Sequence, residues 1–385
     1  MRLLVIVSTD YGELSQAKYF LAGLGAAPMP MMLVPAVLRH PEGIEAGVDV
    51  RTYVTLADIR RFVEEIDPDT VLLFSGYLLT IGNRFSLLNA FLLLRLLRRR
   101  GARIITSDLF FGLLRSPGAL RFWEVLRPHK KGGLWFAASV MGLLLGIRAY
   151  LIHLQLRRDW HIYPAPVARP FPPTDHRGLS YFNASAVPPK AHKAVDAAPL
   201  WLFVLSQVDF RYQANRRGEA FVGHVAARLR DVARRGRRVL MIAPGDLLEE
   251  LRGRIAGVAG VELHDTVSHA EYMRHLMQAE RVFFWNYYSF SVLHRVLANR
   301  PVYYFDEGHM VSILPALKEV GIKTFYGGWR PPLLRVEEPL EEHGLERVAD
   351  ETQEEFSRIK ARMAGSPSPR EVLEAAGAPD MPPLS

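Results

Sequence analysis

Residues 289–305, SFSVLHRVLANRPVYYF, give the clearest indication of the fold. It opens on two serines, Ser289 and Ser291, continues as a short run with helical spacing, and becomes apolar and β-rich after Pro301. Because proline cannot continue a helix interior, the pattern predicts a helix, a turn and a buried strand. Such a unit is typical of a parallel sheet that is covered by helices.

The same alternation continues through the second half of the chain. Strands are predicted over 199–206, 237–244, 261–265 and 280–286, and helices over 218–236, 245–256 and 268–279. The first half alternates in the same way, with strands over 2–8, 31–37, 70–76, 102–108 and 159–166, and helices over about 13–23, 57–66 and 84–99. The sequence therefore predicts an α/β protein with two doubly wound, Rossmann-like domains.

The expected domain boundaries follow the composition. Residues 1–165 would form the N-terminal domain, and the proline-rich residues 166–195 an interdomain link. Residues 196–335 would form the C-terminal domain, and residues 336–385 a helix and a mobile tail.

Composition limits the function classes. The chain has 385 residues and no cysteine, which excludes disulfides, thiolate zinc sites and a cysteine nucleophile. Lysine and arginine exceed aspartate and glutamate by 48 to 40, so anionic partners are favoured. The first apolar run is interrupted too early for a secretion signal. We therefore expect a cytoplasmic protein.

The pattern resembles the GT-B glycosyltransferases, most closely over residues 199–305. In that family an acidic residue on a helix is often followed by Gly-Lys-Pro-Val and a strand. Counting back from Pro301 places His294 at the acidic position, Asn299 at the glycine and Arg300 at the lysine. The segment PDTVLLFSG, residues 68–76, is similar to the usual Pro-Asp strand entry of the family.

The resemblance implies two domains that face a cleft, with the nucleotide-sugar donor on the C-terminal domain. It implies transfer of a sugar to a glycan, a lipid-linked molecule or another acceptor on the N-terminal domain, without a metal ion and with no cofactor besides the donor. Two alternatives stay open: a sugar-nucleotide epimerase, and a non-catalytic GT-B-like protein of envelope or polysaccharide assembly, because His294 replaces the acidic residue.

Candidate donor ligands follow the strands of the C-terminal domain. Ser289 and Ser291 would cap a helix or donate to a diphosphate oxygen. His294 would hold a ribose hydroxyl or lie half-buried on its helix. The segment 206–219, which begins with Ser206, is read as a loop at the cleft. Its arginines, Arg211, Arg216 and Arg217, would either bind phosphate or remain solvated.

Candidate catalytic bases follow the strands of the N-terminal domain: Asp10, Glu13 and Asp108. Any one of them could accept a proton from an acceptor hydroxyl. Glu13 could instead complement the dipole of the first helix. No metal ligands are predicted, because Asp67-Pro68-Asp69 precedes a strand and reads as a turn. No nucleic-acid partner is predicted either, because aromatic residues are not interleaved with the arginines.

Membrane contact is a further expectation. Residues 134–147 are apolar throughout, and Arg127, Lys130 and Lys131 precede them. Fourteen residues are too few to span a bilayer, so the stretch is either a buried core helix or a peripheral contact with anionic lipid at the inner face of the membrane.

Overall fold

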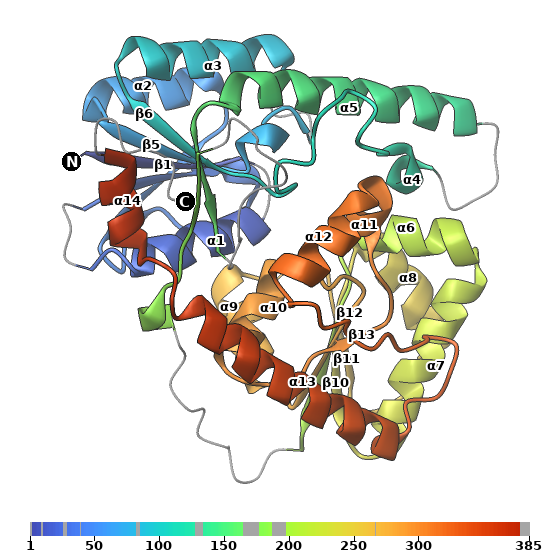
Figure 1. The fold of residues 1–385 in the computed structure, drawn as a ribbon. Helices are drawn as coiled ribbons and strands as arrows, with labels where there is room; N and C mark the ends of the chain where they lie inside the picture. Colours follow the sequence, from blue (N-terminus) through green and yellow to red (C-terminus); the bar gives the residue numbers. More distant parts are fainter. Residues whose placement is uncertain are drawn as a thin grey trace. The chain divides into compact units, whose positions relative to one another are not determined.

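The computed structural model describes residues 2–8, 11–25, 29–38, 40–81, 85–127, 134–164, 177–186, 198–265 and 267–377 (Figure 1). The chain forms two compact units. Unit 1 comprises Met1–Leu120, Leu144–Val187 and Ala361–Ser385, and unit 2 comprises Arg121–Leu143 and Pro188–Lys360. Each unit is built around its own parallel sheet, as the alternation of strands and helices predicts.

The sheet of unit 1 has eight strands in the order β3-β4-β2-β1-β5-β6-β7-β8. Their bounds are β1 Leu3–Val7, β2 Met31–Pro35, β3 Gly43–Glu45, β4 Val48–Tyr53, β5 Thr70–Phe74, β6 Arg103–Ser107, β7 Trp160–Tyr163 and β8 Arg177–Ser180. Only the short edge strand β3 pairs in the antiparallel sense. The strand order reverses between β1 and β5, which is the position where doubly wound sheets bind ligands.

Helices cover both faces of this sheet. They are α1 Tyr11–Ala22, α2 Leu56–Ile66, α3 Leu87–Arg99, the second half of α5 Trp135–Leu156, and α14 Pro369–Gly377. Figure 1 shows α1 and α14 on one face, and α2 and α3 on the other. A Cβ atom at Gly23 would lie 2.5 Å from the Pro369 ring, so the end of α1 can approach α14 closely only because residue 23 is glycine.

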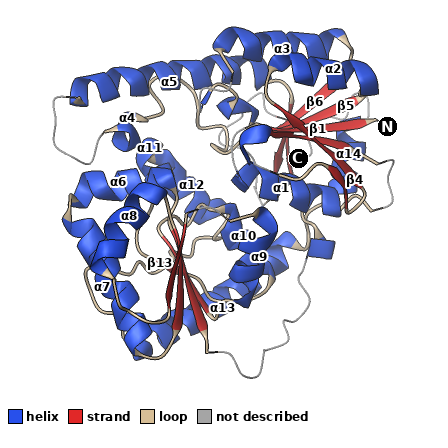
Figure 2. Ribbon diagram, turned by 180° about the vertical axis from the view of Figure 1, so that it is seen from behind, coloured by secondary structure: helices blue, strands red, loops and turns tan. Residues whose placement is uncertain are grey.

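The sheet of unit 2 has five parallel strands in the order β11-β10-β9-β12-β13. They are β9 Leu200–Val204, β10 Arg238–Ile242, β11 Val261–His264, β12 Arg281–Phe284 and β13 Tyr303–Tyr304. The helices are α4 Trp123–Leu126, α6 Gln207–Arg217, α7 Ala220–Arg234, α8 Gly245–Arg254, α9 His269–Gln278, α10 Phe290–Leu297, α11 His309–Ile313, α12 Ala316–Thr324 and α13 Glu342–Met363, the last of which continues into unit 1. Helices α7 and α8 lie on one face, and α9 and α10 on the other (Figure 2).

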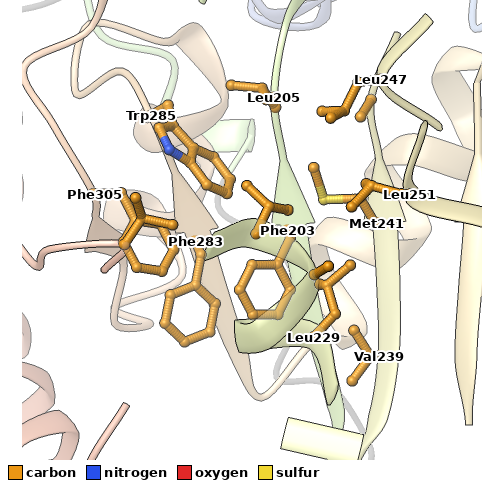
Figure 3. Close-up of a cluster of buried hydrophobic side chains, with 14 of the residues drawn as sticks. Phe203, Leu205, Leu229, Val239, Met241, Leu247, Leu251, Phe283, Trp285 and Phe305 are labelled. Carbon is orange, nitrogen blue, oxygen red and sulfur yellow. The ribbon is translucent and has the colours of Figure 1, made fainter. Parts of the chain in front are cut away.

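Aromatic and aliphatic side chains pack together in the core of unit 2 (Figure 3). The rings of Phe203 and Phe283 stack with centroids 4.5 Å apart. Phe305 lies 5.5 Å from Phe283 and 4.7 Å from Trp285. Phe305 and Trp285 come directly after β13 and β12, so this packing fixes the starts of the loops that follow both strands.

A buried arginine fixes helix α10 against α9. The Arg295 side chain is fully buried, and its guanidinium donates to the carbonyl oxygens of Leu276, Ala279, Glu280 and Pro301 at 2.9–3.3 Å. Burial lowers its pKa to about 9, so it stays charged at neutral pH. It satisfies carbonyls at the end of α9, which no intrahelical bond can reach.

Two expectations need correction. Residues 206–219 are not a loop, because Gln207–Arg217 form α6, capped by Ser206. The segment 166–195 is not wholly a link, because β8 pairs with β7 and extends the sheet of unit 1. Residues 165–176 and 187–197, which make up most of the predicted link, lie outside the described residues.

The C-terminal part also differs from a helix followed by a tail. After α13 the chain forms α14 in unit 1, where Arg370 donates to the carbonyl of Leu24, and Arg103 to that of Gly377. Residues 378–385, within the predicted mobile tail, lie outside the described residues.

Candidate functional site

The carboxyl ends of the strands are the edges where α/β sheets bind ligands. In unit 2, four segments meet at this edge: the starts of α6 and α8, the loop 285–289 before α10, and residues 305–309 after β13. All the sequence-predicted donor residues lie on α6, on α10 or directly before them.

A group of hydrogen-bonded polar side chains at this edge joins residues a hundred positions apart. One carboxylate oxygen of Asp209 accepts from Nδ1 of His309 at 2.8 Å and from the His309 backbone N–H at 3.1 Å. Its other oxygen accepts from the Ser206 hydroxyl at 2.7 Å, and Ser206 in turn caps α6. A carboxylate only accepts, so Nδ1 carries a hydrogen in this contact, and Nε2 is the ring nitrogen that remains for a ligand.

His309 is well placed to meet a ligand. Its side chain is 15% exposed, and among the described residues its Nε2 has no hydrogen-bond partner. A Cβ atom at the preceding Gly308 would lie 2.6 Å from the carbonyl oxygen of Trp285. Glycine at 308 therefore lets the turn after β13 pack against the loop after β12, and it brings His309 beside that loop.

The start of α10 carries the predicted serines. Ser289 accepts from the backbone N–H of Ser291 at 3.3 Å and caps the helix. The hydroxyl of Tyr272 donates to the Ser291 hydroxyl at 2.8 Å, and burial raises the Tyr272 pKa to about 12, so it remains a donor. A hydroxyl that accepts in this way still has its own hydrogen to donate. Both serines can therefore donate to an anion while they hold the helix.

His294 lies in the second turn of α10, half-buried, with its ring edge-on to Phe290 at 5.3 Å. Burial lowers its pKa to about 4, so the imidazole is neutral at physiological pH. It can offer one donor and one acceptor to a hydroxyl but no charge. Protonation of His294 could therefore change ligand affinity only in acidic solutions, and the contact of His294 with a ribose stays a prediction.

The arginines of α6 differ in their surroundings. Arg216 and Arg217 both donate to Asp306, which follows β13, at 2.9 and 3.1 Å, and Arg217 also pairs with Glu337 at 2.7 Å. Arg211 is exposed and forms no ion pair among the described residues. Carboxylates thus already occupy two of the three guanidinium groups, and a phosphate would have to share them.

At the same edge of unit 1, two of the three predicted bases, Glu13 and Asp108, are buried and hydrogen-bonded. Glu13, in the first turn of α1, accepts from the backbone N–H and the hydroxyl of Ser8 at 3.0 and 3.1 Å. The Ser8 hydroxyl also lies 3.0 Å from the carbonyl oxygen of Phe74, so its one hydrogen is shared between Glu13 and the end of β5. Asp108 accepts from the backbone N–H of Phe110 at 2.8 Å and from that of Gly112, so it closes the turn after β6.

These contacts give Glu13 and Asp108 structural roles, and their catalytic roles stay predictions. Asp10, the third predicted base, lies outside the described residues. Among the described residues no group of three or more His, Asp or Glu side chains could hold a metal ion. The pair of Asp209 and His309 and the carboxylate of Asp306 were missed by the sequence reading. Ser206-x-x-Asp209 was readable as a helix cap, but its contact with His309 depends on the tertiary fold.

The buried Asp108 gives a pH prediction. Burial raises its pKa to about 6, whereas an unfolded aspartate has a pKa of about 3.9. Between these values the folded protein binds the proton more tightly, so the free energy of unfolding should fall as the pH rises. Asp108→Asn should remove roughly 2 kcal/mol of this dependence between pH 4 and pH 7.

Urea unfolding of wild type and Asp108→Asn across this range measures the effect. Asp350→Asn, at an exposed position of α13, is the matched control and should follow the wild-type curve. Parallel curves for wild type and Asp108→Asn would show that Asp108 does not titrate in this way.

Comparisons with known proteins agree with the two parallel sheets. No family model matches the sequence, and no curated protein sequence matches it either. A variant of Os79 from O. sativa, solved in complex with UDP, matches with TM-score 0.56 and 12% identity over 98% of this chain and 99% of that chain. A protein assigned as a UDP-N-acetylglucosamine 2-epimerase from Listeria monocytogenes matches with TM-score 0.52 and 14% identity over 97% of this chain and 95% of that chain. The spinosyn forosaminyltransferase SpnP matches with TM-score 0.52 and 15% identity over 98% of this chain and 100% of that chain.

The chain therefore has the GT-B fold, which glycosyltransferases and UDP-N-acetylglucosamine 2-epimerases share. This confirms the predicted fold class. Sequence identities this low show a shared fold but not a shared activity, so the activity is inferred from the site.

Proposed function

We propose that this protein is a glycosyltransferase that moves a sugar from a nucleotide-sugar donor, bound by unit 2, to a glycan, lipid-linked or other acceptor, with no metal ion and no further cofactor. The observation that carries the proposal is the imidazole of His309, which Asp209 holds at the carboxyl edge of the unit 2 sheet beside the loop that leads to Ser289 and Ser291. Two of the fold neighbours were solved with UDP bound, which suggests a ligand of the same chemical class.

The chemistry of the step explains why these groups suit it. When the bond between the sugar and the diphosphate breaks, negative charge develops on the leaving diphosphate oxygens. Donors fixed in advance at that place are usually the largest catalytic contribution. In our proposal the hydroxyls of Ser289 and Ser291 and the start of α10 bind the diphosphate. The imidazolium form of His309 donates a hydrogen bond to the diphosphate through Nε2–H, and Asp209, which accepts from Nδ1–H, stabilises the positive charge of the ring.

The roles of the remaining predicted residues are part of the proposal. His294 would meet the ribose from the middle of α10, and Arg211 would be the phosphate-binding arginine of α6, since its guanidinium has no carboxylate partner among the described residues. Glu13, Asp108 and Asp10 remain the candidate acceptor bases. We also propose that the reaction takes place in the cytoplasm.

A binding screen tests the donor. We expect one nucleoside diphosphate from a panel of uridine, guanosine, adenosine, cytidine and thymidine diphosphates to stabilise the protein by about 2.7 kcal/mol at a hundred times its dissociation constant. His309→Gln should weaken this stabilisation, whereas His343→Gln, exposed on α13, should leave it unchanged. No stabilisation by any of the five would contradict donor binding and favour a non-catalytic GT-B-like protein.

A product analysis then separates the two enzyme classes of this fold. A transferase releases the free nucleoside diphosphate only as the sugar moves to an acceptor or to water. An epimerase instead returns an isomeric nucleotide sugar with the diphosphate still attached. Conversion of the donor into an isomeric nucleotide sugar of the same mass would therefore contradict the transferase proposal and favour the epimerase alternative.

A further inference from the structure

Helix α5, Trp135–Leu156, has an apolar face that the protein does not cover. Its exposed large side chains include Phe136 at 71% and Met141 at 50% of their full area. The set comprises Trp135, Phe136, Val140, Met141, Leu143 and Leu144, together with Leu134 just before the helix. Exposed apolar patches of this kind mark interaction sites more often than scattered single residues do.

The opposite face of α5 is packed against protein along its length. Ala138, Ala149, Ile152 and Leu156 are buried and recur at helical spacing. A Cβ atom at Gly142 would lie 2.5 Å from the backbone nitrogen of Trp123. The helix is long and apolar enough to cross a bilayer by length and composition, yet this packing fixes one whole side of it to the protein. A helix fixed in this way can lie on a membrane but cannot span it.

Positive charges accompany the apolar face. The guanidinium of Arg127 lies over the ring of Trp135 at 5.8 Å, at the start of α5. On α3, Leu88 and Leu92 are exposed on the same helical face as the exposed Arg95 and Arg99. The end of α3 lies beside the end of α5, because Arg98 hydrogen-bonds to Gln155. An arginine thus lies beside the first residue of α5, and two further exposed arginines share a face of α3 with exposed leucines.

We propose that the exposed face of α5, with the arginines of α3, docks the protein on the surface of a bilayer that contains anionic lipid. The apolar side chains enter the boundary between headgroups and acyl chains, and the arginines meet the phosphates of the headgroups. A second copy of the chain would match the apolar residues but would bring the same positive charges together. Charge complementarity therefore favours a lipid surface. The inference does not depend on sugar transfer and requires no nucleotide.

Sedimentation with vesicles tests the proposal. Wild type should bind vesicles of phosphatidylglycerol and phosphatidylcholine in equal amounts, bind pure phosphatidylcholine much more weakly, and be released as salt is raised. The double variant Phe136→Glu/Leu143→Glu should lose at least about tenfold in its affinity for vesicles, because the side chains of Phe136 and Leu143 would each bury apolar area in the lipid. Arg95→Gln/Arg99→Gln should lose roughly thirtyfold on the anionic vesicles at low salt and nothing on the neutral ones.

The matched control changes the same number of exposed apolar residues elsewhere. Ile44 and Val54 are 72% and 73% exposed, and Ile44→Glu/Val54→Glu should bind vesicles as wild type does. Fluorescence quenching in wild type tests the proposal without relying on the folding of the glutamate variants. Brominated lipid should quench the fluorescence of wild type, and Trp135→Phe should lose most of that quenching.

Three results would overturn the inference. Wild type could fail to bind the anionic vesicles. The α5 double variant and the control could bind equally well. Wild type could also be a dimer without lipid that Phe136→Glu/Leu143→Glu converts to a monomer, in which case the face is an interface between two copies.

Discussion

Replacing His309 by glutamine should lower the rate at which nucleoside diphosphate is released from the donor by about a hundredfold. Glutamine can still donate a hydrogen bond, but it carries neither the proton nor the charge that Asp209 stabilises on the imidazole. Because the charge on the leaving diphosphate is largest in the transition state, kcat should fall more than KM rises. Steady-state kinetics on the donor identified by the binding screen measure both quantities.

Asp209 acts through His309, so its replacement makes the comparison sharper. Asp209→Asn should also slow the reaction, and adding it to His309→Gln should cost little more, because the two residues work as one unit. His343→Gln is the control for histidine content and should keep wild-type kinetics. Additive losses for Asp209→Asn and His309→Gln would mean that the contact of 2.8 Å between them has no part in the chemistry.

Replacing Arg295 by methionine should lower the free energy of unfolding of unit 2 by about 3–5 kcal/mol. Methionine fills much of the volume of the arginine stem but leaves the carbonyl oxygens of Leu276, Ala279, Glu280 and Pro301 without their donor in a fully buried place. A change of this size is a large part of the stability of an ordinary domain.

Urea unfolding followed by circular dichroism measures this effect. Arg252→Met, at an exposed position of α8, is the matched control and should change the stability by less than about 0.5 kcal/mol. Equal stability of Arg295→Met and wild type would show that water reaches these carbonyls once the arginine is gone. The effect should appear without nucleotide, which separates it from any loss of ligand binding.

Much of the fold could be predicted from the sequence because its signals are local. The strands at 3–7 and 70–74 are continuous apolar runs, and Pro301 separates α10 from β13. The capping positions of Ser289 and Ser268 could be read in the same way. Such features depend only on residues within a few positions of each other, and the fold preserves them.

The wrong predictions concern segments in which apolar residues do not recur at the spacing of a helix or a strand. Helix α6, QVDFRYQANRR, is mostly polar, so only its serine cap at Ser206 and the Asp209 in its first turn indicate a helix. Strand β8 has four residues, RGLS, with a single large apolar side chain, and parallel pairing with β7 determines its conformation. Neither segment shows the periodicity on which the predictions depended.

The site was predictable only in part. Ser206, Ser289, Ser291 and His294 follow strands of unit 2, as the alternation of elements requires. The contact between Asp209 and His309 joins residues a hundred positions apart in the sequence. The pairing of Arg216 and Arg217 with Asp306 is equally remote in sequence. Long-range contacts between polar side chains leave no periodic signal, so only the structure reveals them.

A crystal structure of the protein with the nucleoside diphosphate that binds most tightly tests the central claim most directly. We expect diphosphate oxygens within hydrogen-bonding distance of His309 Nε2 and of the Ser289 and Ser291 hydroxyls, at the carboxyl edge of the unit 2 sheet. A nucleotide bound elsewhere, with His309 Nε2 still without a contact to it, would contradict the account.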